Sequence, residues 1–156
     1  MKIKSEIKFM YDSSMRYSTF FGSFLFWAFA ILFLLIFNQY NLAFKFFVAT
    51  IIIKVIEYAI KVIYRTRRPA INTKAISFLE KFHDFGSMPS GHASVIALFT
   101  TMVHLNYGNI YLTLLFVIAS LLSGLSRIYL KRHYVKDVVV GYAIGFLIGY
   151  FSSKGF

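Results

Sequence analysis

The segment SRIYLKRHYVKD, residues 126–137, is a polar and basic stretch between two apolar runs. Because the flanking runs are long enough to cross a membrane, we expect the segment at a membrane boundary. His133 and Asp137 are four residues apart, a spacing that places two side chains on one face of a helix. A carboxylate there can accept the Nδ1 proton of the imidazole and leave Nε2 free as a nucleophile or base. Arg127 adds a planar guanidinium that suits a phosphate.

The composition indicates a membrane protein rather than a soluble one. The chain has 156 residues, the size of one domain, and 58% of them are hydrophobic. The net charge of +11 lies mostly between the apolar runs, where basic residues set topology, contact anionic headgroups or bind an anionic substrate. A nucleic-acid partner is not expected, because no soluble basic module remains. The absence of cysteine excludes disulfides, thiolate metal sites and a cysteine nucleophile.

The apolar runs predict an all-α membrane bundle in a single domain, residues 1–156. About five spans are expected, near residues 17–37, 42–64, 89–105, 110–125 and 138–151, the third opening on Pro89. The first run is too long for a signal peptide, so we interpret it as a retained span. Residues 1–16 predict a short amphipathic helix on the membrane surface, and residues 64–88 a loop with one short helix near 75–82.

Two features inside the predicted spans are unusual. Gly141, Gly145 and Gly149 repeat every four residues and indicate a face of small residues for close helix packing. The second span contains charged residues, which are costly at membrane depth and are expected to face the bundle interior and pair. Glu57 has the spacing of such a pair with two lysines, Lys54 three residues before it and Lys61 four residues after it. The sequence leaves open whether Lys54 and Glu57 are structural or catalytic, and the structural role is the simpler interpretation.

Alternation of the spans brings three polar segments to one membrane face. They are the end of the second span, the start of the third, and the boundary between the fourth and fifth. The first carries Lys61 and Arg68, and the second is Pro89-Ser90-Gly91-His92 at a helix start, where free backbone N–H groups bind phosphate. The third is the segment quoted above.

These parts suggest a phosphoryl-transfer mechanism. His133, held by Asp137, would attack phosphorus in line, and His92 would protonate the leaving oxygen and then activate water. The positive side chains would stabilise the equatorial oxygens. No metal and no cofactor are expected, because the cationic cage replaces the magnesium ion used elsewhere and no cluster of carboxylates is present to hold one.

The motifs Lys61-x6-Arg68-Pro69, Pro89-Ser90-Gly91-His92 and Ser126-Arg127-x5-His133-x3-Asp137 resemble the three-part signature of the type 2 phosphatidic acid phosphatase superfamily. That family includes membrane lipid phosphatases, soluble bacterial acid phosphatases and vanadium haloperoxidases. The resemblance implies His133 as nucleophile, Asp137 as its partner and His92 as acid. It implies these phosphate ligands: Lys61, Arg68, Ser90, Gly91 and Arg127. One departure is that membrane members usually place the first motif after the third of six spans, whereas here it follows the second.

The resemblance implies an integral-membrane phosphatase that removes a terminal phosphate from a lipid phosphate or pyrophosphate within the bilayer. The similar families act on phosphatidylglycerophosphate, polyprenyl pyrophosphate, the 1-phosphate of lipid A or phosphatidic acid, and the motifs do not choose among them. The many basic residues favour a highly anionic headgroup. A lipid phosphotransferase and a non-enzymatic anion or lipid transporter stay open as alternatives. No protein partner is implied.

Several charged residues lie outside the motifs. His83 and Asp84 are expected in the loop near the site, as substrate contacts or as loop structure. Lys131 and Arg132 are expected to contact headgroups or a second substrate phosphate. His104 is expected near the opposite membrane face.

Basic residues crowd the expected active face, so the positive-inside rule would place that face in the cytoplasm. The resemblance implies an extracytoplasmic site in the plasma or inner membrane. We expect the extracytoplasmic site, because basic residues recruited for headgroup binding weaken the topology rule.

Overall fold

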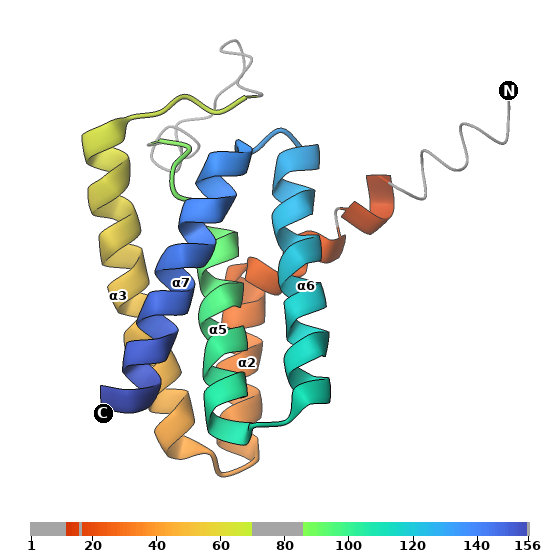
Figure 1. The fold of residues 1–156 in the computed structure, drawn as a ribbon, viewed down its shortest axis with the longest axis vertical. Coiled ribbons are helices and arrows are strands. Elements are labelled where there is room, and N and C mark those ends of the chain that lie inside the picture. Colours follow the sequence, from red (N-terminus) through yellow and green to blue (C-terminus); the bar gives the residue numbers. More distant parts are fainter. Residues whose placement is uncertain (1–11, 16, 70–85, 156) are drawn as a thin grey trace, which may run out of the picture.

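The structure, a computed structural model, describes residues 12–15, 17–69 and 86–155, and these residues are organised as helices (Figure 1). The elements are the 3-10 turn η1 (Thr19–Gly22), α2 (Phe24–Ile36), α3 (Tyr40–Tyr64), α5 (Gly91–Tyr107), α6 (Ile110–Tyr129) and α7 (Val135–Gly155). The predicted all-α class is therefore confirmed. Most of the predicted N-terminal amphipathic helix and all of the loop helix near residues 75–82 lie outside the described residues.

Local sequence explains where several helices begin and end. The Ser23 hydroxyl caps α2 by accepting a hydrogen bond from the backbone N–H of Phe26 at 3.2 Å. Asn109 caps α6 in the same way, accepting from the N–H of Leu112 at 3.1 Å. Gly108 ends α5 in the left-handed region, with a φ of 60°. Gly108 and Asn109 together form the tight turn that joins α5 to α6.

The long apolar helices are typical of an integral membrane protein. Among the described residues, α6 and α7 are each long and apolar enough to cross a membrane, and residues 12–22 with α2 form a third span if that bent pair is counted as one. Large apolar side chains are exposed on the outer surfaces, such as Leu115 and Phe151. The predicted count of about five spans is not confirmed. Helices α2 and α5 have 13 and 17 residues, fewer than the roughly 20 that a span needs. Helix α3 is continuous, but its apolar sequence contains several charged residues.

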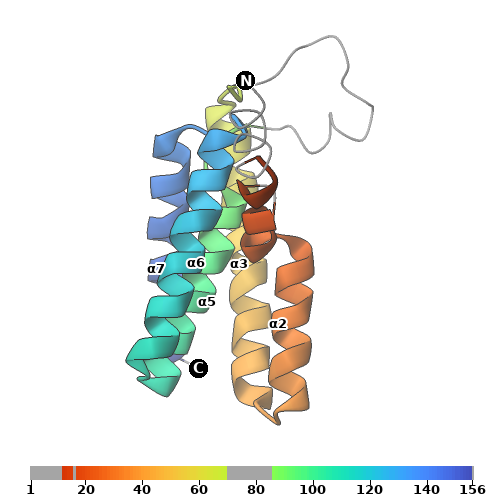
Figure 2. The ribbon, with the colours of Figure 1, turned by 90° about the vertical axis from the view of Figure 1, so that its right-hand side faces the viewer.

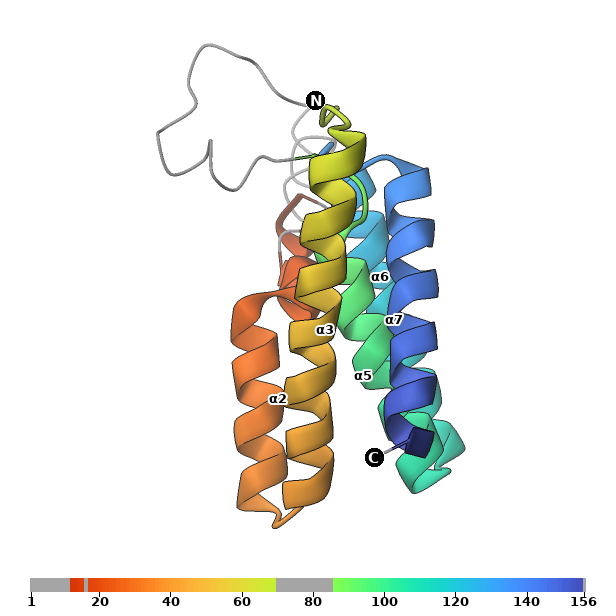
Figure 3. The same ribbon diagram turned by 90° about the vertical axis from the view of Figure 1, so that its left-hand side faces the viewer.

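Helix α5 lies inside the bundle, and its side chains from Ala93 to Leu98 are buried. Helices α2 and α3 lie side by side as an antiparallel pair next to α5, α6 and α7 (Figures 2 and 3). The ring of Phe99 joins these parts. Its centroid lies 5.3 Å from Phe26 of α2, 5.1 Å from Phe46 of α3 and 5.0 Å from Phe116 of α6, each in an edge-to-face arrangement.

The contact between α5 and α7 confirms the predicted face of small residues. A Cβ atom added at Gly141 would lie 2.6 Å from the carbonyl oxygen of Ser90, and one at Gly145 would lie 2.2 Å from that of Ser94. One at Gly149 would lie 2.9 Å from the Cβ atom of Thr101. The two backbones therefore approach so closely that no side chain fits between them.

The Gly145→Ala substitution should lower stability, because the new methyl group overlaps the α5 backbone. We expect a loss of about 1–3 kcal/mol, the usual cost of overpacking. Thermal unfolding in detergent measures it. Gly155→Ala is the control, since a Cβ atom there meets nothing within 4 Å. A Gly145→Ala protein as stable as the Gly155→Ala control would contradict this account of the contact.

Candidate active site

The three predicted polar segments meet at one end of the bundle, at the top of Figure 1. Backbone hydrogen bonds join them. The N–H of Ser87 donates to the carbonyl of Thr66 at 2.7 Å, and the N–H of Ser90 donates to the carbonyl of Asp137 at 2.9 Å. The segment after α3, the segment before α5 and the start of α7 are thus held together by the main chain.

The segment before α5 differs from the prediction in one detail. Pro89 was expected as the first helical residue, but Ser90 has extended backbone angles (φ −79°, ψ 108°) and is the N-cap, so the helix begins at Gly91. The peptide bond between Met88 and Pro89 is cis. The Ser90 side chain is fully buried, and its hydroxyl has no hydrogen-bond partner within the described ranges. A buried, unpaired hydroxyl beside a helix N-terminus suits an anion.

The charged pair of α3 lies directly against this segment. The ammonium of Lys54 is 3.0 Å from the Glu57 carboxylate, so the predicted pairing of Glu57 with Lys54 is confirmed, and Glu57 is buried. A Cβ atom at Gly91 would lie 2.8 Å from Oε2 of Glu57 and 3.1 Å from Nζ of Lys54. Gly91 therefore leaves room for the ion pair at the start of α5.

The turn between α6 and α7 corrects the predicted geometry of His133. Helix α6 continues to Tyr129, so Arg127 lies in its last turn, and α7 begins only at Val135. His133 and Asp137 are therefore not on one continuous helix. Their closest atoms, Nδ1 and Oδ2, are 3.8 Å apart, too far for the expected direct hydrogen bond.

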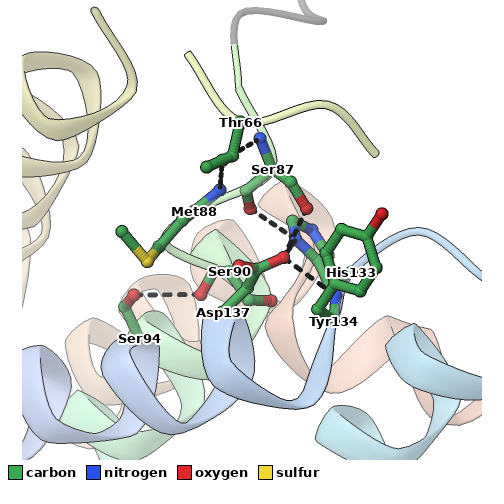
Figure 4. A network of polar contacts seen from close by, with 8 residues as sticks. All are labelled: Thr66, Ser87, Met88, Ser90, Ser94, His133, Tyr134 and Asp137. Carbon is green, nitrogen blue, oxygen red and sulfur yellow. Dashed lines mark hydrogen bonds and ion pairs between the residues drawn. The ribbon is translucent and has the colours of Figure 1, made fainter. Parts of the chain in front are cut away.

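A backbone carbonyl takes the place that the carboxylate was expected to occupy. Nδ1 of His133 lies 2.7 Å from the carbonyl oxygen of Ser87 (Figure 4). Because a carbonyl can only accept, Nδ1 carries the proton, and Nε2 of the neutral ring keeps its lone pair. The main chain therefore sets the tautomer of His133, and it is the one that a nucleophilic Nε2 would need.

The Asp137 carboxylate is fully buried and belongs to the same hydrogen-bond network as His133 and Ser87. Its Oδ2 atom accepts hydrogen bonds from the Ser87 hydroxyl and, at 2.8 Å, from the N–H of Tyr134 (Figure 4). Asp137 also lies in the first turn of α7, where the helix dipole favours negative charge. Sequence reasoning missed Ser87, because one serine before the second motif looks like any loop serine.

Positive charges converge on His133. Burial, together with the nearby positive charge of Arg127, lowers the pKa of His133 to about 4. The hydrogen bond to Ser87 opposes this shift, while Arg68 and Lys61 add to it. The structure thus brings the predicted cationic residues around a neutral imidazole.

Two further predicted residues face the same region. His92, in the first turn of α5, is within electrostatic range of Arg127 and His133. The Nε atom of Arg127 is buried and, among the residues that the structure describes, has no hydrogen-bond partner. Buried unpaired donors are rare, and a donor in this position suits an anionic acceptor such as a phosphate oxygen.

The N-terminal part of the chain also contributes to the site. A Cβ atom at Gly22 would lie 2.4 Å from the carbonyl oxygen of His92, so η1 packs directly on the residue predicted as the acid. The sequence carried no sign of this contact.

The remaining predicted residues lie elsewhere. His104 is near the other end of α5, where its Nδ1 atom is 3.1 Å from the hydroxyl of Thr113, in keeping with its expected place. Lys131 and Arg132 are exposed in the turn after α6. His83 and Asp84 lie outside the described residues.

Comparison with protein families and curated proteins relates this chain to phosphatases. A family model described as "PAP2 superfamily" matches residues 40–156. Lipid A 1-phosphatase of Porphyromonas gingivalis is 39% identical over 66 residues, which are 40% of this chain and 15% of that protein. Phosphatidylglycerophosphatase B of Bacillus subtilis is 36% identical over 80 residues, 45% of this chain and 38% of that protein. The matches thus span less than half the length of either relative.

Two solved structures share the fold over most of this chain. The crystal structure of Aquifex aeolicus LpxE aligns with a TM-score of 0.77 and 26% identity, covering 93% of this chain and 86% of that one. The transmembrane PAP2-type phosphatidylglycerolphosphate phosphatase of Bacillus subtilis aligns with a TM-score of 0.75 and 18% identity, covering 93% and 76%. The second likeness concerns the fold alone.

His133 should stay neutral far below the pH at which an ordinary histidine gains its proton. Because burial and nearby cations disfavour the imidazolium, protonation is expected only as the pH falls through about 4. Histidine NMR titration in detergent measures it, with His133→Asn identifying the resonance. A His133 signal that titrates near 6.5, the usual value, would contradict the electrostatic account.

Proposed function

The chain belongs to the PAP2 superfamily, whose model matches most of its length, and on that premise we propose that it is an integral-membrane lipid phosphatase. One observation carries the proposal. A buried histidine has its Nδ1 proton bound to the Ser87 carbonyl at 2.7 Å, next to converging cations and unpaired buried donors. This arrangement suits a nucleophile that attacks an anionic phosphorus centre.

In the first proposed step, Nε2 of His133 attacks phosphorus in line. A P–N bond forms, the bond from phosphorus to the lipid oxygen breaks, and His92 gives its proton to that oxygen. For this step His92 must begin protonated, and the dianionic phosphate beside it favours that form. The product is a dephosphorylated lipid and a phosphohistidine.

In the second step, water attacks the phosphohistidine. His92 accepts a proton from the water, the P–N bond breaks, and inorganic phosphate leaves. In both steps Lys61, Arg68 and Arg127 stabilise charge on the equatorial oxygens. The Ser90 hydroxyl and the N–H of Gly91 add neutral donors, so the proposed reaction needs no metal ion.

The proposed substrate is a lipid phosphate whose tails stay in the bilayer while its headgroup reaches the basic end of the bundle. The two curated relatives are named for lipid A 1-phosphate and phosphatidylglycerophosphate. The net charge of +11 favours a strongly anionic headgroup of the lipid A or pyrophosphate type. We also propose that this end faces the extracytoplasmic side.

The His133→Ala variant should release phosphate several orders of magnitude more slowly than the unsubstituted protein, because no other group replaces the nucleophile. The measurement is phosphate release in detergent, with EDTA present, from four lipids: phosphatidylglycerophosphate, polyprenyl pyrophosphate, lipid A 1-phosphate and phosphatidic acid. Lys154→Ala, at the opposite end of α7, is the matched control and should keep full activity.

Four outcomes would overturn parts of the proposal. Equal phosphate release by His133→Ala and Lys154→Ala would exclude His133 as the nucleophile, and movement of lipid or anion across the membrane without any phosphate release would identify a transporter. Phosphate release only after a second lipid is added, with the label on that lipid, would identify a phosphotransferase. Loss of activity in EDTA that magnesium restores would show that a metal takes part.

Cysteine labelling should reveal the sidedness of the site, since the natural chain has no cysteine. In intact cells, a membrane-impermeant maleimide should label Tyr134→Cys, which precedes α7, and should label Lys154→Cys at the far end of α7 only after lysis. The reverse pattern would place the site in the cytoplasm, as the positive-inside rule indicates.

A further inference from the structure

We propose that Ser87 is a positioning residue. Its carbonyl orients the ring of His133, and its hydroxyl holds the Asp137 carboxylate at a fixed distance from that ring. The inference rests on the proposed function. It assigns a role to a residue outside the three motifs.

The contacts around Ser87 are direct. Ser87 is fully buried, its carbonyl lies 2.7 Å from Nδ1 of His133, and its hydroxyl donates to Oδ2 of Asp137 (Figure 4). Oδ2 itself is 3.8 Å from Nδ1. Ser87 therefore lies between the carboxylate and the imidazole and makes both of the short contacts that join them.

The first motif segment fixes the backbone of Ser87. The N–H of Ser87 donates to the carbonyl of Thr66 at 2.7 Å and also lies 3.2 Å from the Thr66 hydroxyl, which accepts from the N–H of Met88 at 3.1 Å. Thr66 is two residues before Arg68. A displacement of the Arg68 segment would therefore move the carbonyl that orients His133.

The Ser87 hydroxyl also keeps the carboxylate and the imidazole apart. Oδ2 accepts hydrogen bonds from the Ser87 hydroxyl and the Tyr134 N–H, and these bonds hold it away from Nδ1 of His133. Without the hydroxyl, a small movement would bring Oδ2 from 3.8 Å into hydrogen-bond range of Nδ1. A direct carboxylate contact stabilises the imidazolium more than a carbonyl does, so His133 would protonate at a higher pH.

Among the described residues, the other charged and titratable groups that face His133 come from several neighbouring elements. They are Lys61 of α3, Arg68 after it, His92 of α5, Arg127 of α6 and Asp137 of α7. The Ser87→Ala substitution leaves all of them in the chain. A change in the pH profile would therefore report a new arrangement of the carboxylate and the imidazole.

The test compares Ser87→Ala with Ser87→Thr, which keeps a hydroxyl, and with Ser152→Ala, which removes a buried hydroxyl near the far end of α7. For Ser87→Ala we expect kcat to fall about tenfold to a hundredfold, with KM within about twofold, as for the loss of a hydrogen bond to a charged group. The acid limb of the kcat profile should move to higher pH. Ser87→Thr should recover most of kcat, and Ser152→Ala should match the unsubstituted protein.

An unchanged kcat and acid limb in Ser87→Ala would overturn the inference. The inference would also be overturned if kcat falls only in proportion to the loss of folded protein while the acid limb of the kcat profile stays at the same pH. If Ser87→Ala does not fold, Thr66→Val tests the same network, because it removes the hydroxyl that accepts from Met88 and lies near the N–H of Ser87. Its kcat should fall below that of Thr66→Ser, and equal values would count against the inference.

Failure of the proposed function is distinguishable from failure of this inference. If no lipid phosphate is hydrolysed by any variant, the NMR titration of His133 still reports the role of Ser87. An upward shift of that titration in Ser87→Ala would support the positioning role without the reaction, and an unshifted titration would refute it.

Discussion

The close approach of α7 to α5 is the constraint on which the site depends. Because Gly141 and Gly145 present no side chains, the carbonyls of Ser90 and Ser94 lie against the α7 backbone. The same approach lets the N–H of Ser90 reach the carbonyl of Asp137 at 2.9 Å. The second and third motifs are thereby fixed to each other by main-chain contact, which is less variable than contact between long side chains.

Burial of polar groups in an apolar bundle then determines how the site works. Burying a charge or donor without a partner is costly, and several such groups here have one inside the protein: Oδ2 of Asp137 has Ser87 and Tyr134, and Oε2 of Glu57 has Lys54. The hydroxyl of Ser90 and the Nε atom of Arg127 do not, within the described part of the chain. The proposed phosphate would complete the network by accepting from them.

The sequence predicted the parts of this structure that depend on side-chain pattern. Apolar runs located the helices, the glycine repeat located the closest helix contact, and the alternation of spans brought the three motifs to one end. The motif residues could be proposed individually, because charge, nucleophilicity and donor capacity are side-chain properties. The count of spans was less predictable, since the charges of α3 and the shortness of α2 and α5 blur the boundary between a span and a buried helix.

Other features depend on the backbone and could not be predicted from residue types. The carbonyl that holds His133 belongs to Ser87, and any residue carries a carbonyl. The expected pairing of His133 with Asp137 assumed one continuous helix, whereas the chain turns before α7 begins at Val135. A structure with orthovanadate, a phosphate analogue, tests the central claim most directly. The account predicts vanadium bonded to Nε2 of His133, with its oxygens next to the Ser90 hydroxyl and Arg127. Vanadate bound away from His133, or facing a ring whose Nδ1 has left the Ser87 carbonyl, would contradict it.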